Sequence, residues 1–182
     1  MLAPATTLRS TLVSADDRAL VEQQLGRPPR AFVRVVVRCP WARPAVTEQA
    51  PYDVNDEPFP TTYYLTCPSL VAAIARLEAA GGVARWTAAV ERDPELAADL
   101  EQANAEQRDV RRRLAAGRVG ADGGTSLELG IAGAGRGAGL KCLHAHAAYA
   151  LARPGYELGE GILAELGDLW PEQACCMERP PG

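Results

Sequence analysis

The hydrophobic residues of this chain follow two spacings, one typical of strands and one typical of helices. A β-branched run at 31–38 predicts the clearest strand, and residues 61–66 predict a second. Alternating apolar residues at 126–131 predict a third strand. Between the first two strands, residues 41–60 are polar and rich in proline, so we expect an ordered loop there.

Apolar residues at helical spacing predict the remaining elements. Leu70, Ile74 and Leu77 lie on one helical face, and the glycine pair after Ala80 ends that helix. Asp93 is an N-cap residue followed by proline, which predicts the start of the longest helix. The predicted helices cover about 14–25, 69–80, 83–91, 94–114 and 140–152.

These elements predict one domain over residues 1–182, with a core at about 14–152. The expected fold class is α/β or α+β, with a small sheet of three strands or more packed by helices. Residues 83–116 are expected to form a helical arm, and the proline-rich residues 170–182 a flexible tail. The arm offers a surface for a protein partner.

Composition excludes several classes of function. The net charge is −4, so there is no basic excess with which to neutralise nucleic-acid phosphates. No apolar run reaches the ~18–20 residues that span a bilayer, and the first residues lack the apolar core of a secretory signal. We therefore expect a cytoplasmic protein that binds neither nucleic acid nor membrane, with its five scattered cysteines reduced.

The stretch at 141–146 concentrates the candidate chemistry, because it holds both histidines and one cysteine. If residues 140–152 are helical, Cys142 and His146 are one turn apart on the same face. His144 then points away from them, where it would support a metal ligand without binding the metal or would face a substrate.

Two further cysteines, Cys39 and Cys67, each follow a predicted strand and precede a proline. If the two strands are parallel neighbours, both thiols emerge at the same edge of the sheet. The predicted metal ligands are Cys39, Cys67, Cys142 and His146, a set that suits tetrahedral zinc. The three cysteines alone suit an iron–sulfur cluster. The alternative is that Cys39 and Cys67 are ordinary buried side chains.

The same stretch could also be catalytic, and the sequence alone does not decide whether the protein is an enzyme. Cys142, beside Lys141 and near a histidine at a helix start, has the setting of a reactive thiol. Arg136 and Lys141 follow a glycine-rich turn whose backbone N–H groups suit an anion. The alternative function is a hydrolase or transferase acting on a phosphorylated small molecule, with Cys142 or His144 as catalytic residue.

Three motifs carry a resemblance to a known family. They are the sequences FPTTYYLTCP at 59–68, ELGIAG at 128–133 followed by Arg136, and KCLHAH at 141–146. With them, residues 20–151 resemble the bacterial, mainly actinobacterial, "domain of unknown function 501" family. Genes of that family often lie beside those for enolase, a septum-formation initiator and an exopolyphosphatase. The resemblance implies no activity, but this neighbourhood suggests a third reading, a non-catalytic partner protein in cell division.

Overall fold

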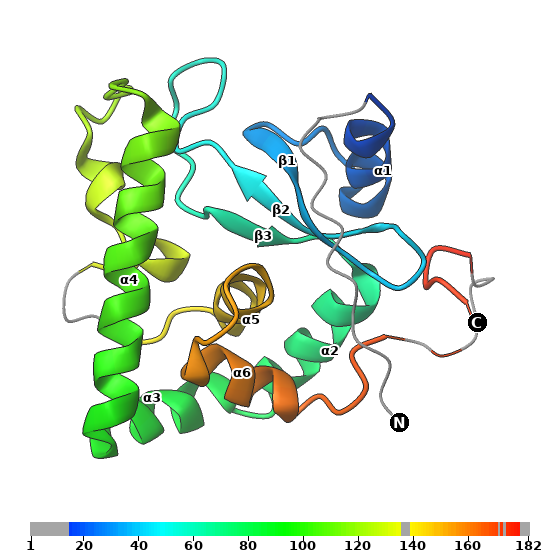
Figure 1. Cartoon of the computed structure of the whole chain (residues 1–182), viewed down its shortest axis with the longest axis vertical. Coiled ribbons are helices and arrows are strands. Elements are labelled where there is room, and N and C mark those ends of the chain that lie inside the picture. The colour runs from blue at the N-terminus through cyan, green and yellow to red at the C-terminus, as the bar shows by residue number, and fades with distance from the viewer. Residues whose placement is uncertain (1–14, 136–138, 171, 173, 179–182) are drawn as a thin grey trace.

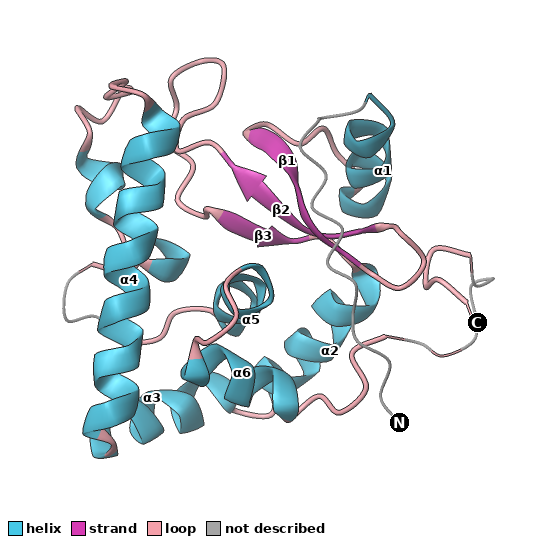
Figure 2. Ribbon diagram, in the orientation of Figure 1, coloured by secondary structure: helices cyan, strands magenta, loops and turns pink. Residues whose placement is uncertain are grey.

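A three-stranded sheet and six α-helices form the described part of the chain, residues 15–135, 139–170, 172 and 174–178 of a computed structural model (Figure 1). The strands are β1 (Phe32–Arg38), β2 (Pro44–Gln49) and β3 (Tyr63–Leu65). The helices are α1 (Ala15–Leu25), α2 (Pro68–Ala79), α3 (Gly82–Arg92), α4 (Pro94–Ala115), α5 (Leu143–Ala152) and α6 (Glu157–Ala164). The sheet is antiparallel in the order β1-β2-β3, so the fold is α+β (Figure 2).

The central strand β2 lies inside the segment predicted to be a loop, so the loop prediction for 41–60 is wrong. All six residues of β2 are buried, and its polar side chains have partners. The Glu48 carboxylate accepts a hydrogen bond from Arg34 at 2.7 Å, and the Gln49 amide donates to Thr47 at 2.7 Å. A central strand that buries paired polar groups has no alternating hydrophobic pattern for the sequence to reveal.

The predicted third strand at 126–131 is also wrong, because this segment forms two 3₁₀ turns, η1 (Thr125–Glu128) and η2 (Ile131–Gly133). Side chains of α4 bind its backbone where a neighbouring strand would otherwise do so. The Asn104 side-chain oxygen accepts the Ile131 N–H at 2.8 Å, and the Arg111 guanidinium donates to the Ser126 carbonyl at 3.0 Å. These bonds satisfy the backbone without a strand partner.

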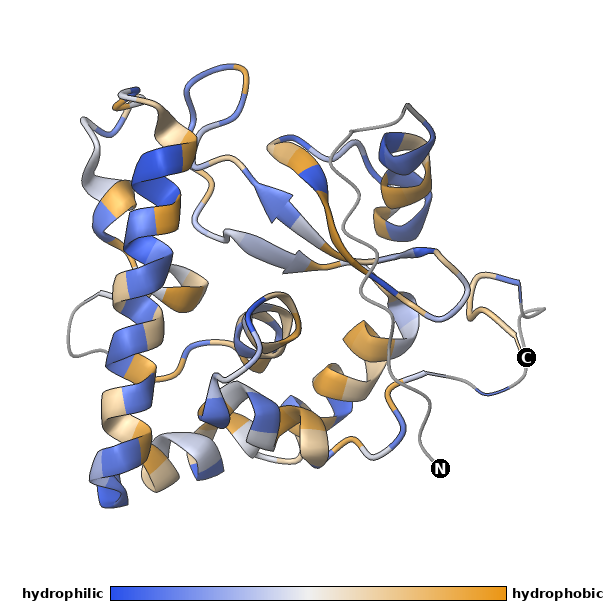
Figure 3. Ribbon diagram, viewed as in Figure 1, coloured by the Kyte–Doolittle hydropathy of each residue, from blue (hydrophilic) through white to orange (hydrophobic). Residues whose placement is uncertain are grey.

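The helices predicted at 83–91 and 94–114 are present as α3 and α4, but α4 packs along its own domain. Most of its residues are hydrophilic (Figure 3). Of its apolar residues, Ala103 and Val110 are buried, and Leu96 and Leu100 pack against the core. These apolar residues of α4 thus pack within the chain, and a protein partner for residues 83–116 stays a prediction.

Helix α5 lies between the sheet and the other helices, where it contacts β3, α2 and α6 (Figure 1). Its residues Leu143, Ala147 and Ala148 are fully buried. Contacts with β3, α2 and α6 on several sides set the position of α5 and of the backbone at its first turn. That turn belongs to the KCLHAH motif.

Candidate metal centre

Helix α5 begins at Leu143, later than the predicted start at residue 140. Cys142 is its N-cap, with extended backbone angles (φ −157°, ψ 118°). An N-cap side chain turns back toward the second and third helical residues and does not lie on the helical face. Accordingly, Cys142 Sγ lies 3.7 Å from Nδ1 of His144, the second residue of the helix. The expected pairing of Cys142 with His146 assumed a helix that had already started.

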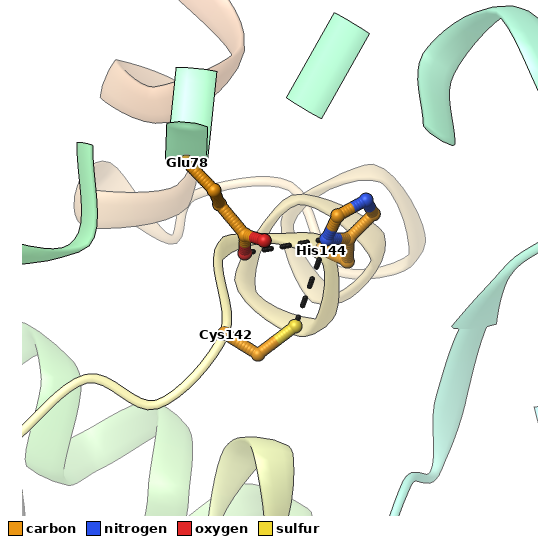
Figure 4. A group of neighbouring side chains, drawn as sticks. All are labelled: Glu78, Cys142 and His144. Carbon is orange, nitrogen blue, oxygen red and sulfur yellow. Dashed lines mark hydrogen bonds and ion pairs between the residues drawn. The ribbon is translucent and has the colours of Figure 1, made fainter. Parts of the chain in front are cut away.

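Helix α2 supplies the third member of the cluster, Glu78, which sequence reasoning missed (Figure 4). Its Oε1 lies 3.2 Å from His144 Nδ1 and accepts the Leu143 N–H at 2.6 Å. Val71, two turns earlier on the same face of α2, accepts a hydrogen bond from His144 Nε2 at 3.1 Å. Since a carbonyl only accepts, Nε2 carries a proton and Nδ1 faces Cys142 and Glu78.

A glycine allows α2 to approach α5 this closely. Gly82 follows the turn after α2, and a Cβ there would lie 2.7 Å from the Leu77 carbonyl oxygen. The same Cβ would lie 3.0 Å from the Leu143 side chain, at the start of α5. The absent side chain thus lets the corner between α2 and α3 pack beside the helix start that Glu78 caps.

The three side chains have the spacing of ligands around one ion. Glu78, Cys142 and His144 each offer one donor atom, and these atoms all lie within 4.8 Å of one another. Tetrahedral zinc bonds imply about 3.3 Å between nitrogen and oxygen ligands and about 3.6 Å between nitrogen and sulfur. The observed separations are 3.2 Å for His144 to Glu78 and 3.7 Å for His144 to Cys142.

The electrostatics of His144 reflect the same two neighbours. The Cys142 side chain, and then the charge of Glu78, raise the pKa of His144 to about 9, against the opposing effect of its partial burial. The side chains of His144 and Glu78 are 25% and 26% exposed, so solvent reaches the cluster. Both neighbours therefore favour a positive charge on the imidazole of His144.

The structure does not bring the other predicted ligands to Cys142. His146 is 2% exposed, its Nδ1 lies 2.7 Å from the Tyr156 hydroxyl, and burial lowers its pKa to about 4. It is a neutral core residue. Within the described residues, the only such group of potential ligands is Glu78, Cys142 and His144, so Cys39 and Cys67 lie outside it.

Of the two residues predicted to bind an anion, Arg136 and Lys141, Arg136 lies outside the described residues. Lys141 is exposed, and its ammonium group donates to the Gly133 carbonyl at 2.9 Å. A polar cavity of about 150 Å³ lies elsewhere, lined by α4 residues together with Tyr149, Arg153 and Tyr156. Neither catalytic candidate, Cys142 or His144, lines that cavity.

A signal for Glu78 was present in the sequence. Leu70, Ile74 and Leu77 form the apolar stripe of α2, and Glu78 follows Ile74 by four residues. An acid on an otherwise apolar stripe requires a partner where the helix packs. The partner is at the start of α5, sixty-five residues later, and no local pattern predicts that contact.

Fold and cluster together define an α+β domain with a candidate metal centre at the first turn of its central helix. The family resemblance is confirmed: the chain belongs to the family described as "Protein of unknown function (DUF501)", whose model matches residues 35–163. No curated protein and no solved structure shows a significant match to the chain. In the described part of the chain, no helix has both the length and the apolar character needed to cross a membrane.

Proposed function

We propose that this protein binds a divalent metal ion, zinc in particular, through Cys142 Sγ, His144 Nδ1 and the Glu78 carboxylate. The observation that carries the proposal is the convergence of these three donors within 4.8 Å of one another. The two separations from His144, 3.2 Å to Glu78 and 3.7 Å to Cys142, match tetrahedral coordination. Thiolate and carboxylate would together offset the charge of the ion. Three protein ligands leave a fourth position for water, as in catalytic zinc sites.

The surroundings of the cluster support a metal ligand more than a catalytic triad. In a nucleophile–histidine–acid triad, the acid and the nucleophile bind opposite nitrogens of the imidazole. Here Cys142 and Glu78 approach the same nitrogen, Nδ1, while Nε2 is held by the Val71 carbonyl. Metal-bound histidines commonly donate their other N–H to a carbonyl in this way.

Zinc titration of metal-free protein, in competition with a chromophoric chelator, tests the proposal. We expect one tightly bound equivalent that depends on these residues, and its affinity should fall about 100-fold or more in Cys142→Ser and in His144→Ala. Glu78→Gln should weaken binding as well, while its amide oxygen can still accept the Leu143 N–H.

Two matched controls identify the site. Cys176→Ser changes another partly buried thiol, and Glu165→Gln changes an acid that pairs with Arg85. Both should retain the equivalent that depends on Cys142. Unchanged zinc affinity in folded Cys142→Ser and His144→Ala would reject the proposal.

A further inference from the structure

Two cysteines that are far apart in the sequence bring their sulfur atoms together at the start of α2. Cys67 is the N-cap of α2 and is 3% exposed, and Cys176 lies in the C-terminal segment, residues 174–178. Their Sγ atoms are 3.8 Å apart, although 109 positions separate the two residues in the chain. At this distance the sulfurs are in direct contact, and no other atom lies between them.

Contacts on both sides of Cys176 hold the C-terminal segment in this place. Cys175 is 1% exposed, and its carbonyl accepts the Glu178 N–H at 2.9 Å, which closes a turn around Cys176. The Glu178 carboxylate pairs at 3.3 Å with Arg43, which lies in the turn after β1 (Figure 1). Cys176 therefore meets Cys67 from a folded turn that is anchored before and after it.

The two thiols differ in how readily a reagent from solvent reaches them. Cys176 is partly exposed, whereas Cys67 is buried. Burial raises the pKa of Cys67 to about 11, against the opposing effect of the Leu70 and Ser69 backbone at the start of α2. Because the thiolate is the form that attacks an oxidant, Cys176 reacts first and Cys67 stays protonated beside it.

We propose that Cys67 and Cys176 are a site of reversible oxidation, at which a peroxide joins the two thiols in a disulfide that ties the C-terminal segment to the start of α2. The direct contact of the sulfurs carries this proposal. Neither thiol belongs to the candidate centre at Glu78, Cys142 and His144, so the proposal does not depend on metal binding. In a reducing compartment, disulfides of this kind are usually transient and redox-sensing.

The reaction takes place in two steps. The Cys176 thiolate attacks one oxygen of the peroxide, so that a sulfur–oxygen bond forms, the oxygen–oxygen bond breaks and Cys176 becomes a sulfenic acid. The Cys67 sulfur then attacks the Cys176 sulfur and gives its proton to the departing hydroxide. With hydrogen peroxide, two thiols and one peroxide thus become one disulfide and two water molecules. The contact at 3.8 Å is close to the ~3–3.5 Å of reacting atoms before a bond forms.

Treatment of the reduced full chain with hydrogen peroxide, followed by alkylation and peptide mass spectrometry, tests the proposal. Cleavage after glutamate separates Cys67 from Cys39, and Cys142 from Cys175 and Cys176. We expect a cross-link between the Cys67 peptide and the peptide that holds Cys175 and Cys176, and dithiothreitol should remove it. The cross-link should be lost in Cys176→Ser and retained in the matched control Cys175→Ala.

Two further measurements separate this proposal from metal binding and from failure of a variant to fold. Cys142→Ser removes a ligand of the candidate metal centre and should leave the cross-link unchanged. In wild-type protein, the disulfide closes the loop between residues 67 and 176, so oxidation should raise the midpoint of urea unfolding. Free Cys67 and Cys176 after peroxide treatment, a Cys176 sulfinic acid in place of the cross-link, or an unchanged midpoint would overturn the proposal.

Discussion

His144 and His146, two residues apart on α5, have opposite environments. His144 faces the thiol and the carboxylate of the candidate centre, whereas His146 is enclosed beside Tyr156. The KCLHAH stretch that the sequence singled out supplies two of the three clustered donors. The sequence assigned the histidines the other way round, since the position of the N-cap decides which histidine Cys142 meets, and Glu78 sets that position through the Leu143 N–H.

The role of Arg111 depends on contacts with distant segments of the chain, which the sequence does not predict. It lies in a run of three arginines at the end of α4, yet it is fully buried. Its guanidinium donates to the carbonyls of Phe59, Pro60 and Ser126, at 3.0 to 3.1 Å. It thereby joins α4 to the loop before β3 and to η1.

Arg111→Lys should destabilise the protein by at least about 2 kcal/mol, because one ammonium group cannot reach all three carbonyls and leaves buried acceptors unpaired. Urea unfolding followed by circular dichroism measures the change. The neighbouring Arg113 is exposed, so Arg113→Lys is the matched control and should stay within about 0.5 kcal/mol of wild type. Equal stability of the two variants would contradict the role given to Arg111.

At the scale of elements, helices and strands that depend on their own sequence could be predicted. Elements that depend on contacts with another part of the chain could not. Strands β1 and β3 and helices α2, α3 and α4 follow from their own hydrophobic periodicity and caps. β2 and η2 do not, because their polar groups are satisfied by other elements. At Gly130, for example, a Cβ would lie 2.2 Å from Asn104 Oδ1, so α4 leaves room there only for glycine.

The corner between α2 and α3 offers a test at this scale. Gly82→Ala should cost about 1–3 kcal/mol of stability, because its methyl group would overlap the Leu77 carbonyl and press on Leu143. The same displacement should move the start of α5 away from Glu78 and weaken zinc binding.

Urea unfolding of the metal-free protein and zinc titration measure the two effects of Gly82→Ala. Gly135→Ala is the control, because a Cβ there has no neighbour within 4 Å. If Gly82→Ala matched Gly135→Ala in both measurements, the close approach of the two helices would not be what positions the cluster.

At the scale of the whole molecule, the antiparallel sheet and the central helix bring distant chemistry together. The candidate centre joins α2 to α5, and the Cys67 and Cys176 sulfurs, 3.8 Å apart, bring the C-terminal segment to the start of α2. The sequence predicted one site from Cys39, Cys67, Cys142 and His146, whereas the structure separates these residues. Composition and periodicity predicted a small sheet packed by helices and left α/β and α+β both open, and the antiparallel pairing decides for α+β. Contacts between residues 65 or 109 positions apart leave no pattern in the local sequence.

The central claim is that Glu78, Cys142 and His144 hold a metal ion. Crystals grown with zinc, with diffraction data collected on both sides of the zinc absorption edge, test it most directly. We predict an anomalous peak about 2.0–2.3 Å from Cys142 Sγ, His144 Nδ1 and a Glu78 oxygen, and its loss in Cys142→Ser. A structure with zinc in the crystal, the cluster as described and no anomalous peak between these three atoms would contradict the claim.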